Sequence, residues 1–113
     1  MGSYRIEKVN ELIKRELGQI IFREFEVPEG SLVTIIKVET TRDLMETKVW
    51  LSIFPIVSAD EIFKNLKKRK EHFQFLLKRK LFLNPLPRIK FILDLTQENV
   101  NLVENILSKI KEE

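Results

Sequence analysis

The feature that most constrains this chain is the way its hydrophobic spacing switches between helical and strand periods. Residues 3–25 carry apolar side chains at three- and four-residue steps with charged residues between them, which predicts one long amphipathic helix. Residues 32–40 and 47–54 are instead rich in β-branched residues, which predicts an antiparallel hairpin. Pro28 and Gly30 predict a type I turn over residues 27–30. A helix followed by a hairpin favours a mixed fold.

Alternation divides the second predicted strand into two faces. Val49, Leu51 and Ile53 share one face, which we assign to the core. Trp50 and Phe54 share the other face, and two interpretations apply to them. We favour packing beneath a helix, and the alternative is an exposed face that binds a partner.

The next segment predicts two helices separated by a break. Pro55 ends the second strand, and either Ser58 or Asp60 could cap the helix that follows. Its apolar stripe then lapses between Leu66 and Phe73. A continuous helix would turn a basic side chain toward the core, so we expect a break near residues 68–72. Pro85 and Pro87 end the second piece.

The C-terminal part predicts a third strand and a last helix. Residues 88–93 alternate, with Ile89, Phe91 and Leu93 expected to point inward. Thr96 can cap a final helix, whose apolar face would be Val100, Val103, Ile106, Leu107 and Ile110. The predicted order is α-β-β-α-α-β-α. At 113 residues the chain has the size of one domain, so we predict a single α+β domain over residues 1–113, with helices packed on a three-stranded sheet.

The side-chain inventory argues against an enzyme. The chain has no cysteine and three glycines, and His72 is its only histidine, which leaves no catalytic pair, metal site or phosphate-binding loop. We expect His72 to be solvated, and Asp43, Glu46 and Asp94 to serve turns and caps. We therefore predict no catalysis, cofactor, metal or small-molecule substrate. Without an apolar run long enough to span a membrane or act as a signal peptide, we expect a cytoplasmic protein.

The charge of the chain is concentrated in one segment. Residues 64–80 hold eight basic residues against Glu71 alone, a local charge of +7 in a chain whose net charge is +3. A basic cluster at a helical break suits contacts to phosphates, and its alternative is an ordinary solvated helix face. Our candidate RNA-binding residues are Lys64, Lys67, Lys68, Arg69, Lys70, Lys78, Arg79 and Lys80. We expect Arg88 and Lys90 to extend this surface if they point outward from the third strand.

Several runs of residues together resemble a known family. They are residues 5–13 with Glu16-Leu17, the turn Thr41-Arg42-Asp43-Leu44 leading to Thr47-Lys48-Val49-Trp50, and Pro87-Arg88-Ile89-Lys90-Phe91 with Asp94. In this order and spacing they resemble ribosome-binding factor A over essentially the whole chain. The chain departs from that family in having Arg69-Lys70-Glu71 where the family has Ala-x-Gly, and Gln74 where members often have arginine.

The resemblance implies a KH-like fold and a non-catalytic assembly factor. Its partners would be the small ribosomal subunit and its rRNA, its role would lie in late maturation of that subunit and in growth at low temperature, and we expect a monomer. The alternative is an adaptor that binds an acidic protein partner through the same basic helices, or through Trp50 and Phe54.

Overall fold

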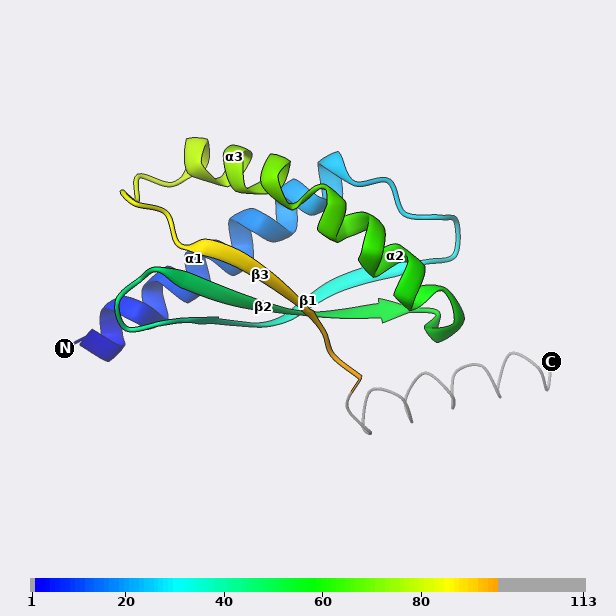
Figure 1. Ribbon diagram of the computed structural model, residues 1–113, viewed down its shortest axis with the longest axis horizontal. Helices are drawn as coiled ribbons and strands as arrows, with labels where there is room; N and C mark the ends of the chain where they lie inside the picture. Colours follow the sequence, from blue (N-terminus) through cyan, green and yellow to red (C-terminus); the bar gives the residue numbers. More distant parts are fainter. Residues whose placement is uncertain (1, 96–113) are drawn as a thin grey trace.

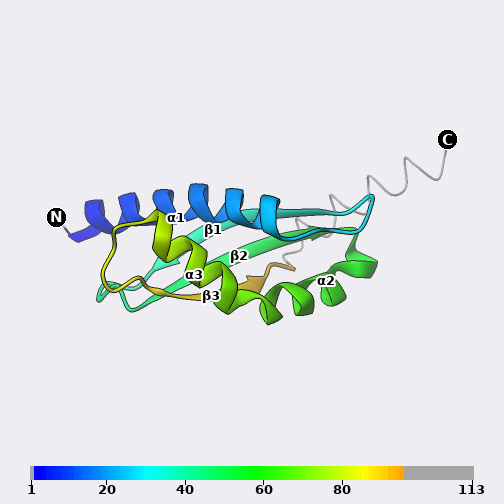
Figure 2. The ribbon, with the colours of Figure 1, turned by 90° about the horizontal axis from the view of Figure 1, so that it is seen from above.

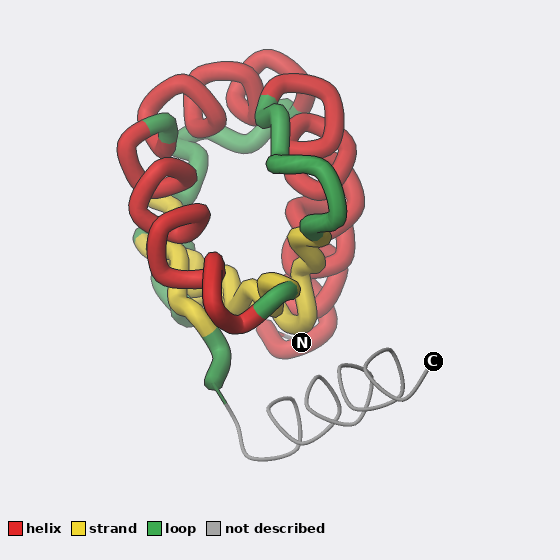
Figure 3. Tube along the Cα trace, turned by 90° about the vertical axis from the view of Figure 1, so that its right-hand side faces the viewer, coloured by secondary structure: helices red, strands yellow, loops and turns green. Residues whose placement is uncertain are grey.

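The described part of the chain, residues 2–95 of the computed structural model, forms a three-stranded sheet with three helices on one face (Figure 1). The helices are α1 (Gly2–Glu24), α2 (Ile56–Lys68) and α3 (Lys70–Lys80), and the strands are β1 (Leu32–Thr40), β2 (Glu46–Phe54) and β3 (Arg88–Leu93). Seen end-on, the helices lie together on one side of the strands (Figure 3). The predicted α+β class is confirmed. The predicted last helix after Thr96 lies outside the described residues.

The sheet has the strand order β1-β2-β3, with β1 antiparallel and β3 parallel to the central β2. The predicted hairpin is thus confirmed. The register shifts once in β1, where Ile35 pairs with Leu51 and Lys37 pairs with Trp50, so that Ile36 is an extra residue. Such a β-bulge reverses the alternation. Val38 and Thr40 therefore turn inward beyond the bulge, and Lys37 turns to the opposite face.

The core lies between the helices and the inner face of the sheet. Val49 and Leu51 of β2 are fully buried and Ile53 nearly so, as predicted. Helix α1 contributes its own stripe, including Ile13 and Leu17, which have no exposed surface. Of the inward residues predicted on β3, Ile89 and Phe91 are buried and Leu93 is partly buried. Burial of this apolar surface is the main force that holds the layers together.

The predicted break between α2 and α3 falls at Arg69, which has φ −100° and ψ 9°. These angles lie in the bridge region, which non-glycine residues can adopt because φ is negative. An arginine therefore fits where the resembled family has a glycine-containing motif. The break lets Leu66 of α2 and Phe73 of α3 both face the core, although six polar residues separate them.

Two local predictions were wrong. The turn before β1 is closed by the N–H of Ser31 donating to the carbonyl of Pro28 at 2.9 Å, one residue later than predicted. Gly30 then takes the third position with φ 83°, as a type II turn requires. Helix α2 begins at Ile56, with Pro55 at its N-cap in an extended conformation and no capping side chain. Ser58 and Asp60, the predicted caps, lie inside the helix instead, because proline with its fixed φ already precedes the first turn.

The outer face of β2 carries Trp50 and Phe54, both half-buried. No helix among residues 2–95 packs over this face, so the favoured interpretation is not supported within the described residues. Instead the ammonium of Lys37, turned outward by the bulge, lies 5.0 Å from the centroid of the Trp50 ring. A cation over an aromatic face is attracted by the ring quadrupole.

Candidate nucleic-acid interface

Helices α2 and α3 hold the cations singled out in the sequence, and we call this set the basic helical surface. Lys64, Lys67 and Lys68 project from α2, and Lys78, Arg79 and Lys80 from the last turn of α3; all six are exposed. Arg69 and Lys70 at the break are half-buried. The two helices follow one another along one side of the molecule (Figure 2). The structure therefore brings the eight residues onto one layer.

The buried sides of α2 and α3 explain why these cations point outward. Ile62 and Leu66 of α2 and Phe73 and Leu77 of α3 are buried at helical spacing. The Phe73 ring makes edge-on contacts with Phe91 at 6.3 Å between centroids, which fixes α3 against the sheet. The basic residues occupy the remaining helix faces, as expected of an amphipathic helix. The cations are thus carried on a rigid scaffold rather than on loops.

Several of these cations have neighbours on the same surface. Lys64 forms an ion pair with Asp60 at 3.1 Å between Nζ and Oδ2, with both side chains largely exposed. Arg79 lies 5.9 Å from the centroid of the Phe75 ring. Exposed ion pairs contribute only about 0–1 kcal/mol, so they do not hold the cations against a stronger anionic ligand. The charge of the surface stays available for phosphates.

Arg69 differs from the other seven residues. Its guanidinium donates a hydrogen bond to the main-chain carbonyl of Glu24 at the end of α1, and it lies 5.6 Å from the centroid of the Phe73 ring. A cation at the C-terminal end of a helix is favoured by the helix dipole. Arg69 therefore ties the break to α1, a structural role that sequence analysis missed.

Arg88 and Lys90 are both exposed on β3 but lie in different surroundings. Arg88 pairs with Glu71 of α3 at 3.6 Å, next to the basic helical surface. Lys90 instead belongs to the outer sheet face, where its strand partner is Lys48. Together with Lys37 these lysines form a second basic group on the outer sheet face, partly compensated by Glu39, which pairs with Lys37 at 3.2 Å. Sequence analysis did not name Lys37 or Lys48 as candidates, although Lys48 and Trp50 are two residues apart in a predicted strand and so share a face.

Gln74 occupies the position where the resembled family often has arginine, and it connects α3 to β3. Its side-chain amide donates to the carbonyl of Pro87 at 2.9 Å and accepts from the N–H of Ile89 at 3.0 Å. These two hydrogen bonds to the backbone around the start of β3 fix how far α3 lies from that strand. His72, one turn away from the break, is exposed as predicted.

The acidic candidates do not form a site among the described residues. Asp43 accepts hydrogen bonds from the Thr41 hydroxyl at 2.6 Å and the Met45 N–H at 3.0 Å, which hold the pKa of its carboxyl below the usual value. This turn role agrees with the sequence prediction. Within residues 2–95, no three His, Asp or Glu side chains gather as a metal site would require. No helix in the same range is long and apolar enough to cross a membrane.

Comparison with solved structures agrees with the fold. The crystal structure of ribosome-binding factor A from Thermus thermophilus superposes with a TM-score of 0.68 at 20% identity, covering 77% of this chain and 93% of that one. A solution structure from Thermotoga maritima, described as a putative ribosome binding factor A, gives a TM-score of 0.59 at 21% identity, covering 84% and 89%. At these identities the likeness concerns the fold, and it is consistent with the KH-like architecture.

Sequence comparison gives the family. The family model described as ribosome-binding factor A matches residues 5–107. The ribosome-binding factor A of Akkermansia muciniphila is 40% identical over 108 residues, covering 92% of this chain and 86% of that protein. The protein of the same name from Clostridium perfringens strain SM101 is 30% identical over 116 residues, covering 99% of both. The match extends over nearly the whole length of both relatives, and on this evidence the chain belongs to the ribosome-binding factor A family.

Proposed function

We propose that this protein is a cytoplasmic, non-catalytic assembly factor that binds the small ribosomal subunit and its rRNA and assists late maturation. Family membership supports a ribosomal partner. The observation that carries the RNA contact is the basic helical surface, in which cations of two helices lie on one rigid layer. In this proposal Arg88 extends the surface at the β3 edge, and Lys90 contributes from the outer sheet face.

The chemistry of the surface supports contacts to the phosphate backbone rather than base readout. Lysine and arginine on exposed helix faces neutralise phosphates and orient the protein but carry little sequence information. Structured RNA is recognised largely by its shape. Selectivity for an unfinished subunit would therefore come from fitting the rigid α2–α3 layer to a site that exists only during assembly.

The experiment is co-sedimentation with small subunits, using three charge reversals on the basic helical surface. We expect Lys67→Glu, Lys68→Glu and Lys78→Glu together to weaken association at least about tenfold, because each removes a phosphate contact and adds repulsion. All three residues are exposed, so circular dichroism and thermal melting should change little.

The matched control has the same net charge but reverses cations elsewhere. Lys14→Glu, Arg23→Glu and Arg42→Glu alter exposed residues of α1 and the β1–β2 turn. We expect this variant to sediment with small subunits nearly as the parent does, and the parent to prefer immature subunits over mature ribosomes. Equal losses in both variants would mean that net charge alone governs binding, and equal binding to mature ribosomes would contradict an assembly role.

A further inference from the structure

An apolar pocket lies away from the break, between the first half of α1 and the segment that follows α3. It has a volume of about 490 Å³. Val9 and Leu12 of α1 form one wall, and Leu81 and Leu83 form the other. Figure 2 shows the C-terminal end of α3 beside this part of α1. The pocket is thus built from two segments that the core holds in place.

Phe82 is the most unusual residue of this pocket. It lines the pocket, yet its relative exposure is 103%, the highest among the large apolar residues described. Leu12 on the opposite wall is also exposed, at 38%. Leaving a phenylalanine ring in water forfeits the free energy of its burial. Apolar side chains exposed together around a hollow are typical of sites that bind a partner.

The charges around the pocket have one sign. Arg5 and Lys8 of α1 and Lys80 of α3 are its charged lining residues, and within the described part of the chain no acidic side chain lines it. The partner should therefore combine a large apolar group with negative charge at its edges. The carboxylates of a protein and the phosphates of a nucleic acid both supply negative charge. The two classes of partner are therefore distinguished by how well they fit the interior of the pocket.

The apolar interior of this pocket favours a protein partner over a nucleic acid. Leucine, valine and phenylalanine line the floor and walls, and they offer no hydrogen-bonding side chains. A nucleobase inserted there would lose the water on its polar edge, and the apolar walls would supply no hydrogen bonds in return. A leucine or phenylalanine side chain loses nothing of this kind. Acidic residues on either side of it would meet Arg5 and Lys80.

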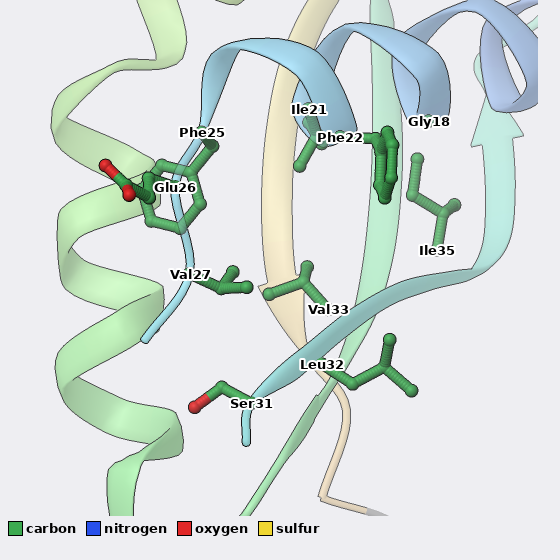
Figure 4. Close-up of a pocket in the computed structure, with 10 residues that line it drawn as sticks. All are labelled: Gly18, Ile21, Phe22, Phe25, Glu26, Val27, Ser31, Leu32, Val33 and Ile35. Atoms are coloured by element: carbon green, nitrogen blue, oxygen red, sulfur yellow. The ribbon is translucent and has the colours of Figure 1, made fainter. Parts of the chain in front are cut away.

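A second apolar groove differs from this pocket in the charge of the residues that line it. It lies between the end of α1 and the start of β1, has a volume of about 440 Å³, and is lined by Phe22, Leu32 and Ile35 among others (Figure 4). Phe22 is 88% exposed, so this groove also carries an exposed ring. Its charged lining residue is Glu26, and none of the lysines and arginines among residues 2–95 lines it. The groove serves as a matched control.

We propose that the pocket around Phe82 docks an acidic amphipathic segment of a partner protein. One large apolar side chain of that segment packs against Phe82 and Leu12, while flanking carboxylates pair with Arg5 and Lys80. The pocket shares Lys80 with the rRNA contact proposed above and otherwise uses other residues, so an RNA-bound molecule would still have Arg5, Leu12 and Phe82 to hold a protein. Lys80 lies at the border of the two surfaces, whereas Arg5 belongs to this pocket alone.

The test uses the full-length protein and a synthetic amphipathic peptide of leucine and glutamate, followed by amide NMR shifts and fluorescence anisotropy. We expect saturable binding, with shifts gathered at residues 8–12 and 81–83. Phe82→Ala should weaken binding about tenfold, as loss of a central aromatic anchor does. Because the ring is fully exposed, this variant should fold normally. Arg5→Glu should also weaken binding, and Lys14→Glu should not.

Any one of the following results would overturn the proposal. The first is absence of saturable binding at millimolar peptide. The second is equal binding of the same peptide with lysine in place of glutamate, or an equal loss on Phe22→Ala in the second groove. The third is a single-stranded oligouridylate that shifts residues 81–83 and loses affinity on Phe82→Ala, which would make the pocket a nucleic-acid site. Oligouridylate shifts confined to residues 64–79 would support two separate surfaces.

Discussion

The two faces of the sheet differ in what covers them and in the charges they carry. The inner face is apolar and lies beneath three helices, and its buried polar pair, Thr40 and Thr47, is joined at 2.9 Å between hydroxyl oxygens. The outer face carries Lys37, Lys48 and Trp50, all outside the core. Cations therefore occur on both sides of the molecule. Both sets stand over buried residues, since Lys48 lies between Thr47 and Val49 of β2 and the basic helices pack on the same core. The two faces therefore differ in what carries the cations, helices on one side and strands on the other.

The largest expected effect compares Phe73 of α3, which packs against the inner face of the sheet, with Trp50 on the outer face. Phe73 of α3 has no exposed surface and contacts the rings of Phe25 and Phe91. We expect Phe73→Ala to lower the free energy of unfolding by about 3–5 kcal/mol, because it leaves a cavity in the core. Trp50→Ala should cost about 1–2 kcal/mol, since the indole is only half-buried. Urea unfolding measures both, and an equal loss at Trp50 would show that the outer face is covered as well as the inner one.

A smaller effect tests how the helix layer is held to the sheet. Gln74→Ala removes both hydrogen bonds, the one to the carbonyl of Pro87 just before β3 and the one from the N–H of Ile89 in β3. We expect a loss of about 1–3 kcal/mol, because the part-buried Ile89 N–H and Pro87 carbonyl are left without these partners. Asn65→Ala on the exposed side of α2 is the matched control and should stay within about 0.5 kcal/mol. If the two variants unfold at the same urea concentration, Gln74 does not fix the layer.

The smallest effect lies in the turn at the end of the hairpin. The Thr41 hydroxyl and the Met45 N–H lower the pKa of Asp43 in the folded protein. Its carboxylate therefore stabilises the fold above the unfolded pKa of about 3.9, and this contribution is lost as pH falls through the lower folded pKa. Thermal melting of Asp43→Asn between neutral and acidic pH should show a slightly weaker acid dependence than the parent. A steeper dependence would contradict this assignment.

The parts of the fold that follow from periodicity were predicted correctly. Apolar alternation identified the buried face of β2, and the lapse in the helical stripe predicted a break near residues 68–72, where the structure has it at Arg69. The cations counted in residues 64–80 lie on α2, on α3 and at the break between them, because helical spacing puts polar residues opposite the core; their contact with RNA stays a prediction. These features depend on neighbours in the sequence, which is why the sequence alone could reveal them.

The parts that depend on distant residues could not be predicted. The hydrogen bond from Arg69 to the Glu24 carbonyl and the two bonds of Gln74 join segments far apart in the chain. The bulge at Ile36 is visible in the sequence as a change in the alternation of apolar residues in β1, between Ile35 and Val38. This change can be interpreted as a bulge only once the pairing of β1 with β2 is known. The pocket at Phe82 likewise needs α1 and α3 side by side.

The most direct test of the central claim compares the salt dependence of RNA binding for the two basic regions. Binding to small-subunit rRNA would be measured across salt concentrations for the parent, for Lys67→Glu, Lys68→Glu and Lys78→Glu combined, and for Lys37→Glu, Lys48→Glu and Lys90→Glu combined. Each phosphate neutralised contributes roughly −0.7 to −0.9 to the slope of log affinity against log salt. We predict that the helical variant loses about two to three units of slope and the outer-sheet variant at most about one. The reverse order would place the RNA contact on the outer sheet face and contradict the account.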